Sequence, residues 1–74
     1  MKDVKIYTEA GIRIQCLREQ YGLTREEMGE VVGITGKCIY EIETGRKGFS
    51  ASVLLKIAVA FGVNCDYIMT GKKG

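Results

Sequence analysis

The feature that most restricts the fold of this chain is a helix-start and helix-stop pattern that occurs five times. In each repeat a residue able to cap a helix precedes a helical stretch, and a glycine closes it: Thr8 and Gly22, Thr24 and Gly33, Thr35 and Gly45, Ser50 and Gly62, Asn64 and Gly71. Ser, Thr and Asn side chains accept hydrogen bonds from the first helical turn, and glycine adopts the left-handed conformation that ends a helix. Because the chain also lacks proline and alternating β-branched runs, the pattern predicts an all-α fold of five short helices.

Apolar spacing supports this prediction in two of the stretches. One face of the first predicted helix carries Ala10, Ile14, Leu17 and Tyr21. One face of the fourth carries Leu54, Ile57, Ala58 and Phe61. Such spacing indicates helices that bury one side against a shared core.

The second and third stretches together match a helix-turn-helix. Thr24 and Glu27 form a capping-box signature, and only Gly33-Ile34-Thr35 separates the two helices. Seven positions fit the motif: apolar Met28, Val32, Ile34, Ile39 and Ile42, with Gly29 at the helix crossing and Gly33 at the turn. A generic helical hairpin is the alternative, but it would not usually place small residues at both glycine positions.

Length and composition indicate a single domain, residues 1–74, with residues 1–7 as a flexible arm and 72–74 as a flexible tail. The chain is 46% apolar and 27% charged, which is a globular composition. The longest uncharged stretch, residues 57–65, is too short to span a bilayer, and no signal peptide is recognisable. We therefore expect a cytoplasmic protein with no membrane association.

The absence of histidine bears on function. It removes the usual zinc sites, the Ser–His and Cys–His nucleophile pairs and the commonest general base. The three cysteines are widely spaced and form no C-x-x-C pair. We therefore expect no catalytic site, no metal, no cofactor and no small-molecule ligand.

Beyond the central motif, the chain resembles the lambda-repressor/Cro (Xre-type) family over about residues 8 to 71. The resemblance is carried by Gly11-x-Arg13-Ile14-x-x-Leu17-Arg18-Glu19, Gly22-Leu23-Thr24, Ile42-Glu43-x-Gly45 and Leu54-Leu55-Lys56-Ile57-Ala58. It implies a compact five-helix domain that binds operator DNA as a dimer, with the third helix in the major groove. It also implies a buried ion pair between Arg18 and Glu43, and dimer contacts near the fifth helix at Val63, Tyr67 and Met69.

If residues 36–44 enter the groove, two sets of side chains face DNA. The predicted base-reading residues are Lys37, Cys38, Tyr40 and Glu41; ordinary solvated or phosphate-bound roles are the alternative for Lys37 and Glu41. The predicted phosphate contacts are Arg25, Thr35, Gly36, Arg46 and Lys47. Two of these residues depart from the family pattern. At position 36 the family commonly has Gln or Arg, and at position 25 it commonly has Gln. Cys38 could make binding sensitive to oxidation, although a simple reduced thiol is the plainer interpretation.

These features predict a sequence-specific transcriptional regulator that binds double-stranded DNA. We interpret it as a repressor that acts as a homodimer, and a protein partner is a further expectation. The net charge is only +2, so DNA binding depends on cations concentrated on one face. The alternative is a protein-interaction module that keeps the fold but reads DNA with little selectivity. Gly36 and the small net charge favour that alternative.

Overall fold

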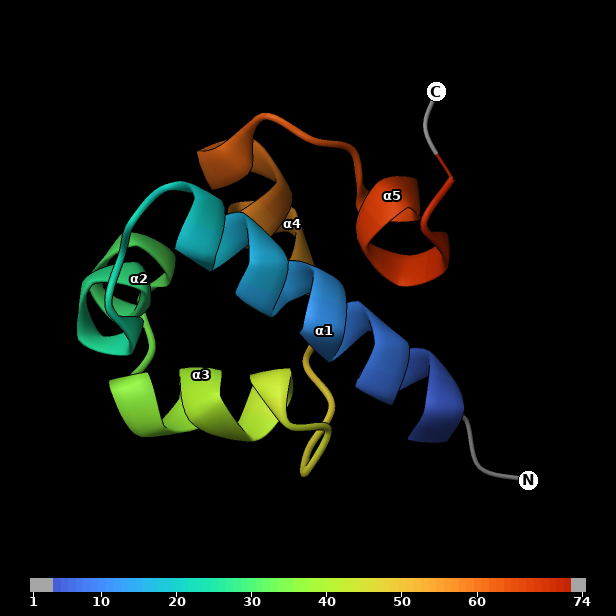
Figure 1. Cartoon of the computed structure of the whole chain (residues 1–74), viewed down its shortest axis with the longest axis horizontal. Helices are drawn as coiled ribbons and strands as arrows, with labels where there is room; N and C mark the ends of the chain where they lie inside the picture. The colour runs from blue at the N-terminus through green and yellow to red at the C-terminus, as the bar shows by residue number, and fades with distance from the viewer. Residues whose placement is uncertain (1–3, 73–74) are drawn as a thin grey trace.

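The computed structural model describes residues 4–72, which form five helices (Figure 1). The helices are α1 (Val4–Gln20), α2 (Arg25–Val32), α3 (Gly36–Glu43), α4 (Ala51–Phe61) and α5 (Cys65–Thr70). No strand occurs among these residues, so the all-α prediction is confirmed. In Figure 1, α1 crosses the middle of the molecule, with α3 below it and α5 above it. Within residues 4–72 no helix is both long enough and apolar enough to cross a membrane.

The caps explain where most of the helices begin and end. Four of the predicted starts are confirmed, because a side chain at each accepts a hydrogen bond from the N–H three residues later: Thr24, Thr35, Ser50 and Asn64. At the first of these, the backbone N–H of Thr24 also donates to Glu27 Oε1 at 2.8 Å, which completes the capping box. All five predicted stop glycines have positive φ, between 67° and 87°.

The predicted start of the first helix is wrong. α1 begins by Val4, so Thr8 lies inside the helix and residues 4–7 are part of α1. A tertiary contact explains the extra turn, because the Tyr7 ring packs edge-on against Phe49, with 5.2 Å between the ring centroids. Residues 1–3 of the predicted arm and residues 73–74 of the predicted tail lie outside the described residues.

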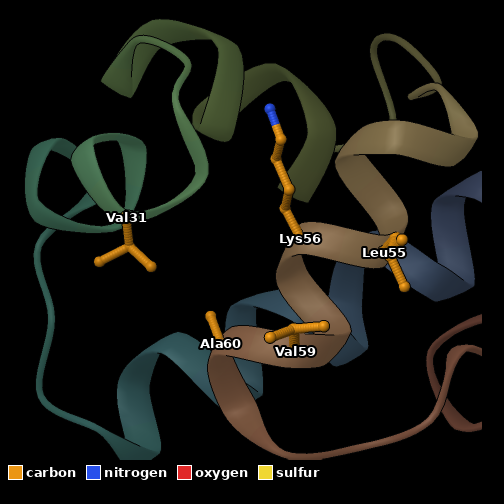
Figure 2. A pocket seen from close by; sticks show the side chains of 5 residues that line it. All are labelled: Val31, Leu55, Lys56, Val59 and Ala60. Atoms are coloured by element: carbon orange, nitrogen blue, oxygen red, sulfur yellow. The ribbon is translucent and has the colours of Figure 1, made fainter.

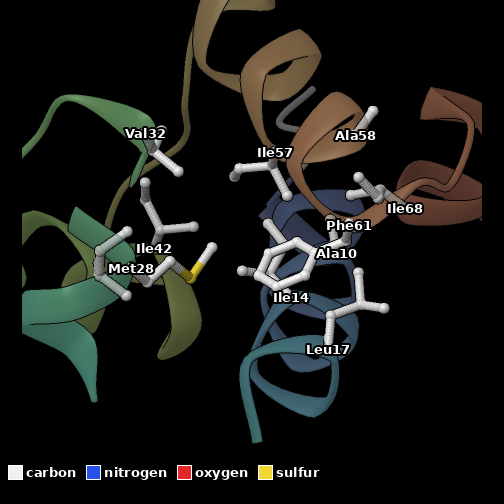
Figure 3. Close-up of a cluster of buried hydrophobic side chains, with 11 residues drawn as sticks. Ala10, Ile14, Leu17, Met28, Val32, Ile42, Ile57, Ala58, Phe61 and Ile68 are labelled. Atoms are coloured by element: carbon white, nitrogen blue, oxygen red, sulfur yellow. The ribbon is translucent and has the colours of Figure 1, made fainter. Parts of the chain in front are cut away.

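The core draws buried apolar side chains from all five helices (Figure 3). They are Ala10, Ile14, Leu17, Met28, Val32, Ile39, Ile42, Ile57, Ala58, Phe61 and Ile68. The predicted α4 face is buried except for Leu54, which is half-buried. Tyr21 differs from its prediction, since it lies beyond the end of α1 and is 57% exposed. Its ring covers Phe61 from outside, with centroids 4.9 Å apart.

The helix-turn-helix follows the seven predicted positions. Met28, Val32, Ile39 and Ile42 are buried, and half-buried Ile34 packs against them. Gly33 has φ of 87° and donates its N–H to the Gly29 carbonyl at 2.7 Å. A Cβ on Gly29 would collide with the backbone oxygen of Ile34. The turn therefore passes so close to α2 that only glycine fits at the crossing.

Replacing Gly29 with alanine is expected to lower the free energy of unfolding by about 1–3 kcal/mol, because the turn backbone must move. Gly36→Ala is the matched control. The three atoms nearest to its methyl group would all belong to the flexible Glu26 side chain, the nearest at 3.0 Å. Alanine also favours helix over glycine, here by less than the about 1 kcal/mol of a helix interior, because Gly36 is the first residue of α3. Urea denaturation followed by circular dichroism should show opposite signs for the two variants. Equal losses would contradict the close approach at Gly29.

Candidate nucleic-acid interface

The outward face of α3 consists of the side chains that the core does not bury. It carries the four predicted base readers, of which Lys37 and Tyr40 are exposed, and Cys38 and Glu41 are half-buried. Thr35 fixes the start of this face, because its hydroxyl accepts a hydrogen bond from the Cys38 N–H at 3.1 Å. The helix is therefore buried on one side, through Ile39 and Ile42, and open to solvent on the other.

A buried carboxylate lies behind this face. The Glu43 side chain is fully buried at the end of α3, and its Oε2 accepts a hydrogen bond from Arg18 Nε at 2.6 Å. Its Oε1 accepts a second hydrogen bond from Arg25 Nε at 3.0 Å. Hydrogen bonding to Glu43 also raises the pKa of Arg18 above its ordinary value. One carboxylate thus joins α1, α2 and α3.

The pairing of Arg18 with Glu43 is the one implied by the family resemblance, whereas the Arg25 contact was not predicted. The sequence predicted only a phosphate contact for Arg25. In the structure its side chain is 36% exposed and its Nε is held by Glu43. Because this bond spans 18 residues, no local spacing rule could have indicated it.

The same arginine contacts an aromatic side chain on the outward face. Arg25 Cζ lies 5.2 Å from the centroid of the Tyr40 ring, and Arg46 Cζ lies 5.6 Å from it. Both distances are within the range of a cation–π interaction. We call Arg25, Tyr40 and Arg46 the arginine–tyrosine cluster. It brings two of the predicted phosphate contacts to one predicted base reader.

Lys47 occupies the other side of the face. Its Nζ lies 3.5 Å from Glu41 Oε1 and donates a hydrogen bond to Cys38 Sγ at 3.5 Å. The pKa of Cys38 is lowered, first by its hydrogen bond with the Thr35 side chain and then by Lys47. The thiol and Glu41 in turn raise the pKa of Lys47. Two predicted base readers are therefore engaged by a predicted phosphate contact.

Cys38 is expected to react with iodoacetamide faster than the exposed Cys16, because a lowered pKa leaves more of its thiol as thiolate at neutral pH. Its advantage should shrink as the pH rises beyond about 8.5, where ordinary thiols also ionise. Lys47→Met should slow Cys38 and leave Cys16 unchanged. Peptide mass spectrometry would measure both rates, and equal rates in the wild-type protein would contradict the activation of Cys38.

The predicted dimer residues and the most exposed apolar residues lie in different places. Val63, Tyr67 and Met69 are half-buried and pack against the core. A hollow of about 400 Å³ lies between α2 and α4, lined by Val31, Leu55, Lys56, Val59 and Ala60 (Figure 2). Val59, in its lining, is 73% exposed. The i, i+4 spacing of Leu55 and Val59 is the sequence signal that could have indicated this surface, which sequence reasoning missed.

The described residues also bear on metal binding. Within residues 4–72 no group of three or more His, Cys, Asp or Glu side chains is placed to hold a metal ion.

Two helices joined by a tight turn, with the second helix open to solvent beside Arg25, Arg46 and Lys47, define a helix-turn-helix domain of the DNA-binding class. Residues 11–74 match the helix-turn-helix domain family. An uncharacterised HTH-type transcriptional regulator of Bacillus subtilis, YgzD, is 33% identical over 54 residues, covering 73% of this chain and 82% of that protein. The chain belongs to the helix-turn-helix family of DNA-binding transcriptional regulators.

Solved structures share the fold. The P22 c2 repressor, determined with a synthetic operator, superposes with a TM-score of 0.81 over 85% of this chain and 96% of its own, at 24% identity. The restriction-modification controller C.AhdI of Aeromonas hydrophila gives 0.77 over 84% and 94%, also at 24% identity. The clp gene regulator ClgR of C. glutamicum gives 0.76 over 85% and 82%, at 24% identity. The five-helix arrangement is thus common to these regulators.

Proposed function

We propose that this protein is a cytoplasmic transcriptional repressor that inserts α3 and the following Thr44 into the major groove of a duplex operator. The observation that carries the proposal is the outward face of α3, where Lys37 and Tyr40 are exposed and three cations border the helix. Repressor activity is further supported by the fold shared with the P22 c2 repressor.

Each side of the interface has a proposed task. Base edges are read from Lys37, Cys38, Tyr40 and Glu41, with Lys37 donating to guanine O6 and N7. Phosphates are bound by Arg25, Arg46 and Lys47, and by the start of α3 at Thr35 and Gly36. With Lys37 this gives four cations per protomer, so a dimer would neutralise about 6–8 phosphates.

The deciding measurement is a salt-titrated binding isotherm on DNA flanking the protein's own gene, with a scrambled duplex of equal length as the control. The proposal expects binding at least about a hundredfold tighter to the native segment. It also expects a log–log salt slope steeper than about −4. Equal and weak binding to both duplexes would overturn operator reading.

We also propose that the protein binds as a homodimer, with Val63, Tyr67 and Met69 around α5 as the contacts. Their partial burial leaves part of each side chain accessible. Met69→Asp is expected to shift the dimer to monomer in sedimentation at tens of micromolar, since it places a charge in an apolar contact. Val59→Asp, on the hollow between α2 and α4, is the control and should leave the dimer intact. If Val59→Asp gave a monomer and Met69→Asp a dimer, the dimer contact would lie at the hollow instead.

The alternative function is a protein-interaction module with little operator selectivity. Two observations favour it. Gly36 offers no side chain at the start of α3, and the Glu41 carboxylate is engaged by Lys47. The exposed apolar residues beside the hollow would then receive a protein partner.

A further inference from the structure

The outward face of α3 offers fewer hydrogen-bonding groups than its sequence suggests. Lys47 holds both the Glu41 carboxylate and the Cys38 thiol. The Thr44 hydroxyl donates to the backbone oxygen of Tyr40 at 2.9 Å, and so stays within its own helix. Gly36 has no side chain. Lys47 therefore competes with DNA for Cys38 and Glu41, whereas Lys37 is exposed to solvent.

Tyr40 is different, because it is both exposed and held in place. Its side chain lies midway along α3 and the residue is 40% exposed. Two guanidinium groups lie over its ring, at 5.2 and 5.6 Å. One of them, on Arg25, is in turn anchored by the buried Glu43 carboxylate. A ring restrained in this way loses little conformational entropy when it meets a ligand.

A restrained aromatic ring can recognise an apolar feature in the groove. In B-DNA the major groove presents one such feature, the C5 methyl group of thymine. The guanidinium groups beside the ring match the phosphates that border the groove. Ring and cations therefore suit a thymine flanked by phosphate backbone better than a hydrogen-bonding base edge.

We propose that Tyr40 is a specificity-determining residue of this protein and contacts a thymine methyl group in each half-site, with Arg25 and Arg46 as its positioning residues. This assignment rests on the proposed function, since it requires α3 in the major groove. It concerns the ring of Tyr40 and not its hydroxyl, so Tyr40→Phe keeps the contact and Tyr40→Ala loses it.

The test begins by selecting duplexes from a random-sequence pool with the full-length wild-type protein. Thymines of the tightest duplex are then replaced one at a time by uracil, which removes only the methyl group. Each half-site should have one thymine whose replacement weakens binding about fourfold, because a buried methyl group is lost. Replacing this thymine in both half-sites should weaken binding about fifteenfold. The ratio of thymine to uracil affinity is compared for the wild type, Tyr40→Phe and Tyr40→Ala.

The expected result is that the wild type and Tyr40→Phe share this ratio, whereas Tyr40→Ala binds both duplexes equally. Because each ratio is taken within one protein, a general loss of folded protein cancels. Uracil sensitivity that persists in Tyr40→Ala would overturn the assignment, as would a selected sequence indifferent to uracil. Loss of the ratio in Tyr40→Phe would assign the contact to the hydroxyl and overturn it too. Failure to enrich any sequence would overturn operator reading itself, and Tyr40 with it.

Discussion

Glu43→Gln is expected to lower the free energy of unfolding by about 3–5 kcal/mol, because it leaves Arg18 buried without its carboxylate partner. For a domain of this size each kcal/mol shifts Tm by about 4–8 °C, so the expected loss is at least about 12 °C. The amide is nearly isosteric with the carboxylate, so the effect reports charge and not volume. Thermal denaturation followed by circular dichroism at constant pH would measure it.

Arg25→Gln is the matched control for that experiment. Its side chain is 36% exposed, and Glu43 keeps Arg18 when Arg25 is removed. Half-exposed ion pairs contribute little, so we expect a loss below about 1 kcal/mol. A Glu43→Gln variant that melts within about 2 °C of the wild type would show that the buried carboxylate contributes little to stability.

Charge reversal of Lys37, Arg46 and Lys47 together is expected to abolish DNA binding, with an affinity loss of at least about a hundredfold at moderate salt. In a dimer it reverses six of the eight interface cations, so the salt slope should fall from about −5 to −7 toward about −2. The variant should stay folded, because Lys37, Arg46 and Lys47 are exposed. Binding isotherms at several salt concentrations give both quantities.

The same triple variant also tests the alternative function, and Lys72→Glu is its control. Lys72→Glu changes one charge of the same kind just after the end of α5, a helix that lies on the opposite side of α1 from α3 (Figure 1). It should leave the affinity for DNA within about twofold. If the triple variant still bound DNA as the wild type does, the outward face of α3 would not be the interface. A triple variant that loses DNA but keeps a protein partner would show two separate functions.

Local signals made much of the fold predictable. The starts of α2 to α5 depend on caps that bond to residues three positions away, and the turn depends on Gly29 and Gly33. Such contacts join residues that are close in the sequence, so a local pattern can predict them. The start of α1 was predicted wrongly because it depends on Tyr7 meeting Phe49, which lies 42 positions later in the chain. Local propensity gives way there to tertiary packing.

The candidate site was predictable as a set of residues but not as an arrangement. The resemblance placed Lys37, Tyr40 and Glu41 on the outward face of α3, where the structure also has them. It could not show that Lys47 turns back onto Glu41, because that depends on the course of the chain after Gly45. The contact between Arg25 and Tyr40 depends in the same way on how α2 crosses α3.

The Glu43 carboxylate, which both Arg18 and Arg25 contact, couples local unfolding of α1 to the position of Arg25. Arg18 belongs to α1 and Arg25 to α2, so local unfolding of α1 removes a partner from the group that holds Arg25 in place. Binding and local stability are then linked, and by reciprocity a ligand that favours the ordered Arg25 must also favour the closed α1. Bound DNA should accordingly slow hydrogen exchange at α1 amides that face away from it.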